Sequence, residues 1–403
     1  MQSETKNCKN CKIEFIIVTE DFEFYEKVKV PPPTFCPDCR MQRRMAWRNE
    51  RGLHMRTCDL CAKQVVSLHP ADARFPVYCQ TCWWTDKWDP MSYGRGYDFS
   101  RPFFEQFKEL QSVVPRQHTN NYAESTMVNS QYSNCSGECK NCYMIIATSY
   151  SEDCLYTHYV TTAKNCVDCL YVDKSENCYD CLDLEHCYNL RYSQSCVGSH
   201  DADFLFDCRN CSDCIGCVGL RSQQYCIFNE KYSKEEYEQK KKELALDTRE
   251  GLSEFRKQYF SKDFFYKFPR KCLHGQMNKD STGDYIANTE NCKEAFYTKN
   301  SRGCKFCLFF YDATDTYDGT AWGEQELCYE TVTTGEGSNN VKFCNMCWGS
   351  TRNLEYCDHC FSRATDCFGC VGLRGKKFCV LNKQYIEEKY HALTKKIREQ
   401  MIR

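Results

Sequence analysis

A short stretch that occurs twice decides the fold of this chain. It reads Asp213-Cys214-Ile215-Gly216-Cys217-Val218-Gly219-Leu220-Arg221 in the first copy and Asp366-Cys367-Phe368-Gly369-Cys370-Val371-Gly372-Leu373-Arg374 in the second. The match continues in register with a cysteine, an asparagine and a tyrosine, which are Cys226, Asn229 and Tyr232 in the first copy and Cys379, Asn382 and Tyr385 in the second. A repeat of this kind indicates an array of copied structural units.

Cysteines upstream of the first copy recur at a short, regular period. Cys142, Cys154, Cys166 and Cys178 are 12 residues apart, and each follows Asn or Asp. This period is too short for a helical repeat, and it predicts coils of a narrow β-solenoid with two short strands and two turns per coil. The ladder continues less regularly in both copies, through Cys181, Cys187, Cys196, Cys208 and Cys211, and through Cys292, Cys304, Cys307, Cys328, Cys344, Cys347, Cys357 and Cys360.

Each copy of the repeated stretch stands just before a polar segment with helical character. These segments predict helices over 233–244 and 384–401, which would cap the exposed ends of the solenoids. The repeated stretch is therefore the predicted closing coil of each solenoid. In that position Gly216 and Gly219 serve tight corners, and Arg221 hydrogen-bonds the terminal coil.

The ladder thiols have three interpretations. The favoured one is that stacked cysteines fill a core too narrow for leucine, because free cysteine is among the most buried residue types. Metal binding and disulfide or redox chemistry are the alternatives. In a straight strand the two cysteines of a CxxC pair, such as Cys166 and Cys169, face opposite sides, so we expect such a pair to chelate only across a corner.

Composition places the chain outside the secreted, membrane and highly charged classes. It has 403 residues, 35 cysteines, 14% aromatic residues and a formal net charge of −2. The first residues lack the apolar core of a signal peptide, and no stretch is apolar enough to span a membrane. We therefore expect a cytoplasmic protein with no membrane partner, whose thiols stay reduced and available as metal ligands or as buried groups.

The first 50 residues contain two CxxC pairs with the spacing of a zinc site. Cys8, Cys11, Cys36 and Cys39 supply four thiolates for one tetrahedral zinc ion, with short strands expected over 15–18 and 22–25. The segment 8–45 resembles the bacterial "probable zinc-ribbon" domain family. The matching residues are Cys8, Cys11, Phe24, Tyr25, Pro33, Cys36, Pro37, Cys39, Arg40, Arg43 and Arg44.

A second set of four cysteines follows at a spacing typical of structural zinc. These are Cys58, Cys61, Cys79 and Cys82. All eight candidate ligands are thiols, so the sequence predicts two closed structural zinc sites without a position for a catalytic water.

A basic segment lies between the two sets. Arg40, Arg43, Arg44, Arg48 and Arg51 fall on one stripe at helical spacing, and Trp47 lies among them. Such a stripe suits phosphate, and Trp47 could stack on an unpaired base. The alternative is that the stripe docks onto acidic surface within the protein, since arginine suits carboxylates equally well. The acidic first array, with 15 Asp and Glu against 6 Lys and Arg over 120–230, is the expected partner.

Three tryptophans follow the second cysteine set. Trp83, Trp84 and Trp88 could form a base-stacking platform, but packing against a neighbouring unit is favoured for so dense a group. The sequence from Trp83 onward resembles a segment of an uncharacterised family of cysteine-rich bacterial proteins that also carry the probable zinc-ribbon domain. A capped helix is predicted over 103–113.

No sequence motif points to catalysis. The phosphate-binding, dinucleotide-binding, zinc-protease and nucleophile-elbow patterns do not occur, and His359, between Cys357 and Cys360, is expected at a coil corner. We therefore expect a protein that is not an enzyme.

The predicted fold class is mainly β, with two N-terminal zinc ribbons followed by a duplicated, cysteine-rich β-solenoid with capping helices. Its units are the first ribbon (1–50), the second ribbon (51–115), the first solenoid (116–258) and the second solenoid (259–403). The expected function is zinc-dependent, non-catalytic binding of nucleic acid or a ribonucleoprotein through the N-terminal zinc ribbons. The alternatives are a scaffold that binds proteins on the solenoid and, third, a thiol-based metal-binding or redox protein.

Overall fold

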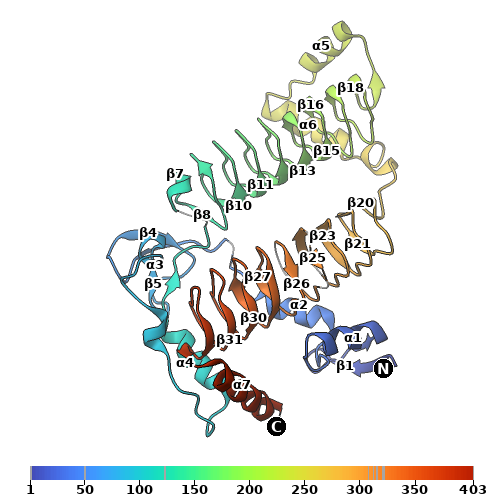
Figure 1. Ribbon diagram of the computed structural model, residues 1–403. Helices are drawn as coiled ribbons and strands as arrows, with labels where there is room; N and C mark the ends of the chain where they lie inside the picture. Colours follow the sequence, from blue (N-terminus) through green and yellow to red (C-terminus); the bar gives the residue numbers. More distant parts are fainter. Residues whose placement is uncertain are drawn as a thin grey trace.

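The two solenoids lie side by side and run in opposite directions (Figure 1). This computed structural model describes residues 2–49, 51–121, 124–306, 308–311, 313–314, 316–319 and 323–402. The described part is mainly β, with seven α-helices, about 20 solenoid turns and two cysteine tetrads near the N-terminus. Helices α5 (Lys234–Glu243) and α6 (Arg249–Tyr259) follow the first solenoid at its far end, and the second solenoid returns toward the ribbons. The predicted fold class is confirmed.

The solenoid strands are short and pair in parallel with the strand one turn away. In the first solenoid they are β7 (Met127–Val128), β8 (Ser133–Asn134), β9 (Cys139–Lys140), β10 (Ile145–Ser149), β11 (His158–Thr161), β12 (Leu170–Asp173), β13 (Leu182–Glu185), β14 (Tyr188–Arg191), β15 (Gln194–Val197), β16 (His200–Asp203), β17 (Ser212–Ile215), β18 (Gln224–Ile227) and the antiparallel β19 (Glu230–Lys231). In the second they are β20 (Gly275–Gln276), β21 (Gly283–Asp284), β22 (Ile286–Ala287), β23 (Ala295–Lys299), β24 (Leu308–Tyr311), β25 (Ala313–Thr314), β26 (Gln325–Glu326), β27 (Val332–Thr334), β28 (Ser338–Lys342), β29 (Asn345–Cys347), β30 (Arg352–Glu355), β31 (Thr365–Phe368), β32 (Lys377–Val380) and the antiparallel β33 (Lys383–Gln384). Cys307 of the ladder lies outside the described residues.

Each coil of the first solenoid has four corners, so the expected two strands and two turns are wrong. Positive φ recurs at every third residue, as in Asn141, Met144, Ala147 and Tyr150 of one turn, and Asp153 begins the next. The residue after each corner points inward, which is why Cys142, Ile145, Thr148 and Ser151 are all buried. Asn and Asp tolerate the left-handed region better than other side chains, which explains why they precede the ladder cysteines.

Small inward side chains satisfy the backbone at these corners. Ser151 accepts a hydrogen bond from the amide of Ala163 (3.2 Å) and donates to the carbonyl of Ser149 (2.8 Å). The Cys166 thiol similarly donates to the carbonyls of Lys164 and Ser175 (3.4 and 3.6 Å). Both members of a CxxC pair face inward because a corner lies between them, as at Asp168 between Cys166 and Cys169, so the pair does not lie on a straight strand. These contacts favour the packing interpretation of the ladder.

The second solenoid contains three consecutive turns that are one residue longer. Partners one turn apart are 12 residues apart in most of the array, but they are 13 apart in the pairs Asn339–Glu326, Asn345–Asp358 and Asn353–Asp366. The extra residues stack at one corner, where the amide of Ser350 donates to the carbonyl of Glu336 (2.7 Å) and that of Arg363 donates to Gly349 (2.7 Å). The bulged corner changes the direction of the side chains beside it.

The repeated stretch closes each solenoid, as predicted, and a helix packs on it in both copies. Gly216 has φ +62°, and a Cβ there would lie 2.7 Å from the ring of Phe255 in α6. At the equivalent Gly369, a Cβ would likewise lie 2.7 Å from the ring of Phe103 in α4 (Phe103–Val113). Arg221 hydrogen-bonds the carbonyl of Asp207, in the adjacent coil. Arg374 instead donates to the carbonyl of Trp83 in the second ribbon (2.8 Å), so the two arginines differ.

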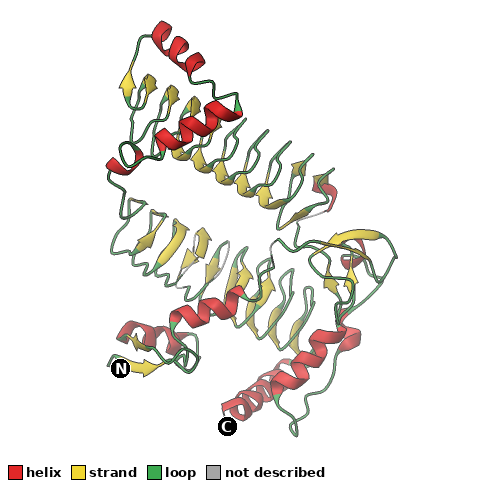
Figure 2. Cartoon of the chain, turned by 180° about the vertical axis from the view of Figure 1, so that it is seen from behind, coloured by secondary structure: helices red, strands yellow, loops and turns green. Residues whose placement is uncertain are grey.

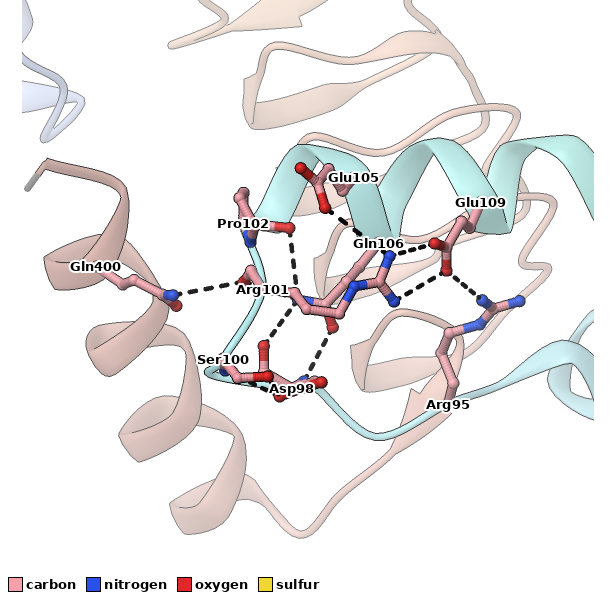
Figure 3. Close-up of polar contacts among 9 residues, drawn as sticks. All are labelled: Arg95, Asp98, Ser100, Arg101, Pro102, Glu105, Gln106, Glu109 and Gln400. Carbon is pink, nitrogen blue, oxygen red and sulfur yellow. Dashed lines mark hydrogen bonds and ion pairs between the residues drawn. The ribbon is translucent and has the colours of Figure 1, made fainter.

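The helices around the second closing coil are α4 and α7 (Glu387–Ile402), and the expected helices at 103–113, 233–244 and 384–401 are present. Figure 3 shows how the segment before α4 is fixed. Gln106 accepts from the amide of Asp98 (2.9 Å) and donates to its carbonyl (2.9 Å), while Gln400 of α7 donates to the carbonyl of Arg101 (3.4 Å). Arg95 and Arg101 both pair with Glu109. Helices α4 and α7 are thereby tied together.

The ribbons contain short hairpins and helices. The first has β1 (Glu4–Asn7), β2 (Glu14–Ile17), α1 (Thr19–Lys27) and α2 (Pro37–Met45). The second has β3 (His54–Thr57), β4 (Gln64–Ser67), β5 (Val77–Tyr78) and α3 (Gln80–Trp83), and the short connections include β6 (Arg116–Gln117) and the 3-10 helices η1 (Pro90–Tyr93), η2 (Glu124–Thr126) and η3 (Phe265–Lys267). The strand expected over 22–25 is wrong, because Asp21 caps the amide of Val18 (3.2 Å) and starts α1 there.

Candidate metal centres and binding cleft

The four cysteines of the first ribbon meet at one point. Cys8 and Cys11 lie in the turn after β1, while Cys36 occupies the position before α2 and Cys39 lies in the first turn of that helix. Their sulfur atoms all lie within 4.8 Å of one another, and those of Cys11 and Cys36 are 3.7 Å apart. Four thiolates around a zinc ion, with Zn–S bonds of about 2.3 Å, have sulfurs about 3.8 Å apart. The arrangement therefore has the dimensions of a metal site.

The second ribbon repeats this geometry with its own tetrad. Cys58 and Cys61 lie in a hairpin turn, and Cys79 and Cys82 lie at the start of α3. All four sulfurs lie within 4.8 Å of one another, and those of Cys61 and Cys79 are 3.8 Å apart. Both predicted ligand sets are thus assembled, and each could hold a metal ion.

Backbone amides point at the sulfurs and favour thiolate. The amide of Cys36 donates to the Cys8 sulfur (3.3 Å), and that of Cys79 donates to the Cys58 sulfur (3.2 Å). Although burial opposes ionisation, backbone hydrogen bonds from Cys36 and Cys11 lower the pKa of Cys8 to about 6. The pKa of Cys61 is lowered to about 7, chiefly by a backbone hydrogen bond from Lys63. Each tetrad therefore has one thiol ready to ionise at neutral pH.

The arginines of α2 face the second solenoid. Arg40 and Arg44 have side chains 3% exposed, and both pair with the buried Asp318, at 2.6 Å and 3.6 Å. Arg43 is half-exposed and pairs with Glu330. These arginines thus dock within the protein. They contact the second solenoid, whereas the acidic first solenoid was the expected partner. Arg40 and Arg44 are buried in these ion pairs.

The other residues of the basic segment lie beyond the helix. Helix α2 ends at Met45, so the expected single helical stripe does not extend to Arg48 and Arg51. Trp47 is 56% exposed, and it lies with Arg48 at the edge of a cavity. Arg51 contacts Nδ1 of His158 on the first solenoid, at 2.7 Å. Arg43, Trp47 and Arg51 are exposed and Arg48 is half-buried, so these four residues are the part of the predicted nucleic-acid set that reaches the surface.

A cleft lies where the second ribbon, the start of the first solenoid and the long turns of the second solenoid meet. Its larger cavity has a volume of about 640 Å³, and its walls include Trp84, Trp348 and Phe361. A smaller cavity of about 220 Å³ adjoins it and shares Cys135 and Met346 with it. Sequence reasoning missed this cleft because its walls come from three distant segments.

The three tryptophans of the second ribbon divide between packing and the cleft. Trp83 is fully buried and Trp88 is 8% exposed, and their rings lie 4.6 Å apart. Trp84 is 45% exposed and faces the larger cavity. The interpretation that these tryptophans pack against a neighbouring unit therefore agrees with Trp83 and Trp88 but not with Trp84.

A buried charged cluster forms one wall of the smaller cavity. Asp358 pairs with Arg116 at 2.7 Å and with His359 at 2.6 Å. Despite its burial, the charges of Arg116 and His359 hold the pKa of Asp358 well below its usual range. Burial and the nearby His359 and Arg116 lower the pKa of His69 to about 3, so this imidazole is neutral at pH 7. His359 has φ +54° and stands at a coil corner, as predicted.

The comparisons with known proteins do not assign this chain to a family. Among the described residues, no helix combines the length and apolar character needed to cross a bilayer. The resemblance of residues 8–45 to the zinc-ribbon family stays a prediction. No protein-family model matches the chain, and no curated protein matches it significantly.

Proposed function

We propose that this chain is a zinc-dependent, non-catalytic binding protein, in which two zinc ribbons fix the walls of the cleft. The observation that carries the proposal is the assembly of two all-thiol tetrads, each with sulfur spacings that suit a tetrahedral ion. Four thiolates form the ligand set of structural zinc and leave no position for a catalytic water. Zinc would supply folding energy to the ribbons and no reaction chemistry.

The ribbons connect zinc to the cleft through packed contacts. In the first ribbon, α2 follows the tetrad and places Arg40 and Arg44 against Asp318. In the second ribbon, Cys79 is the N-cap of α3 and Cys82 lies within it, and the helix ends at Trp83, directly before Trp84. Loss of either metal would release one of the elements that holds the second solenoid in place.

Metal content and metal-dependent stability test this proposal. We expect about two zinc ions per chain and about one in Cys36→Ser or in Cys79→Ser, with an unchanged count in the control Cys272→Ser, whose thiol is exposed and outside both tetrads. Chelation should lower the thermal unfolding temperature of the wild type. A zinc content that Cys36→Ser and Cys79→Ser leave unchanged would contradict the proposal.

A second candidate function is binding of single-stranded nucleic acid at the edge of the smaller cavity. The exposed ring of Trp47 beside Arg48 favours it, because an aromatic ring can stack on a base while arginine contacts phosphate. We expect salt-dependent binding of random-sequence RNA that weakens several-fold in Trp47→Ala and Arg48→Ala and is unchanged in Arg302→Ala, whose side chain is 78% exposed on the second solenoid. Absence of binding at low salt would exclude this candidate.

A further inference from the structure

The larger cavity of the cleft has an aromatic, anionic lining. Trp84 and Phe361 form two of its walls, with ring centroids 5.7 Å apart and planes at 62°. Trp348, one turn before Phe361 in the same column, forms a third wall. Of the described residues that line the cavity, Glu336 alone carries a formal charge. Its volume of about 640 Å³ lies within the range of small-molecule sites.

The three long turns of the second solenoid build this lining. Glu336 and Gly349 stand at the corner that carries the extra residues, and a Cβ on Gly349 would lie 4.0 Å from a carboxylate oxygen of Glu336. Gly349 has φ +76° and follows Trp348 directly, so Trp348 and Glu336 stand on adjacent turns beside this corner. The insertions therefore place one acid beside the aromatic walls.

We infer that this cavity binds an organic cation of the alkylammonium class. Aromatic faces attract cations through their quadrupole, and a carboxylate at the rim adds charge complementarity. One of these rings already has a cation beside it, because the Arg374 guanidinium lies 5.9 Å from the centre of the Trp84 ring. A ligand with phosphate is disfavoured, because Glu336 would repel it and no lysine or arginine lines this cavity among its described residues.

Two sources of such a cation fit the aromatic walls and Glu336. One is a free quaternary ammonium compound, and the other is a methylated lysine side chain of a partner protein. This inference rests on the proposed function, because the zinc ribbons hold the cleft walls in place.

Calorimetric titration with choline and its neutral isostere 3,3-dimethylbutan-1-ol tests the inference. We expect choline to bind at least about tenfold more tightly than the isostere, because only the cation gains from the rings and from Glu336. Tighter binding of an acetylated trimethyllysine amide than of choline would assign the cation to a protein side chain, and the reverse order would assign it to a free metabolite.

Variants locate the binding and separate its failure from that of the proposed function. Glu336→Gln and Trp348→Leu should each weaken choline binding by about tenfold, with Glu388→Gln, exposed on α7, as the unchanged charge-matched control. Equal affinity for choline and its isostere, no binding at millimolar concentration, or binding of adenosine monophosphate alone would overturn the inference. Zinc content and thermal unfolding of the same samples report separately on the proposed function.

Discussion

The buried ion pair between the first ribbon and the second solenoid gives a sharp test of how the molecule is held together. Asp318 has a side chain only 1% exposed, and it faces the guanidinium groups of both Arg40 and Arg44, which are 3% exposed. Replacing Asp318 with Asn removes the negative charge with little change of volume. Two buried positive charges then lose the carboxylate that they share, although the Asn carbonyl can still accept one hydrogen bond.

Breaking a buried pair on one side costs about 3–5 kcal/mol, and the retained hydrogen bond places Asp318→Asn near the lower end. A loss of about 3 kcal/mol raises the equilibrium population of the undocked ribbon about 100-fold. Hydrogen–deuterium exchange of α1 and α2 measures this population, because their amides become accessible when the ribbon separates. We therefore expect exchange there to accelerate about 100-fold in Asp318→Asn.

An exposed ion pair provides the matched control. Asp180 of the first solenoid and Arg256 of α6 pair at 3.3 Å, but their side chains are 54% and 45% exposed. Such a pair contributes up to about 1 kcal/mol, so Asp180→Asn should change exchange in α6 by less than about fivefold. If Asp318→Asn accelerated exchange in α1 and α2 no more than that, the buried pair would not be what docks the first ribbon.

Three further predictions concern the corners, the cleft and the contact between the solenoids. Gly219→Ala should lower the free energy of unfolding by about 1 kcal/mol, because Gly219 has φ +71° but open space around its Cβ position. Gly216→Ala should cost about 1–3 kcal/mol more, because the added Cβ also meets Phe255. Equal losses of the two variants in urea unfolding would contradict this. The pKa of His69 is lowered to about 3 in the folded state, against about 6.5 in the unfolded chain. The neutral imidazole therefore contributes its full stability above pH 6.5, and the free energy of unfolding should fall by about 2 kcal/mol as the pH drops to 5. His69→Gln should flatten this pH dependence in urea titrations. The Tyr297 ring of the second solenoid stacks on Tyr171 of the first (4.3 Å) and on Tyr285 (4.6 Å), so Tyr297→Ala should lower the free energy of unfolding by about 2 kcal/mol. Tyr150 is 65% exposed, and Tyr150→Ala should lower it by less than about 0.5 kcal/mol. Similar shifts of the unfolding temperature in both variants would show that the stack does not stabilise the molecule.

The sequence was informative where the signal is local. Ligand spacing predicted both tetrads, and the repeated stretch predicted the closing coils because its glycines must occupy special backbone positions there. The number of corners per coil could not be read from the 12-residue period, which gives the length of a turn and not its shape. The inward period of three was nevertheless visible in the spacing of Cys166, Cys169, Cys178 and Cys181, which are all buried.

Long-range docking could not be predicted because no local rule selects the partner of a charge. Arg40 and Asp318 are 278 residues apart, and any exposed carboxylate would have matched the arginine equally well in the sequence. The cleft escaped detection for the same reason. The extra residue in three consecutive turns of the second solenoid was its one sequence signal, and it becomes recognisable only when the turns are aligned with those of the first.

The two copies share a sequence pattern but have different surroundings, and this difference explains why the cleft forms at the second solenoid. The glycine of the first closing coil receives Phe255 from a helix that follows it, so the first copy is covered by its own downstream segment. The matching Gly369 receives Phe103 from a helix that precedes the whole array. The second copy therefore depends on the N-terminal units for its cover, and it alone contains the long turns that shape the cleft. The first solenoid and its helices carry the chain outward and back, so that the second copy meets the ribbons and closes the cleft against them.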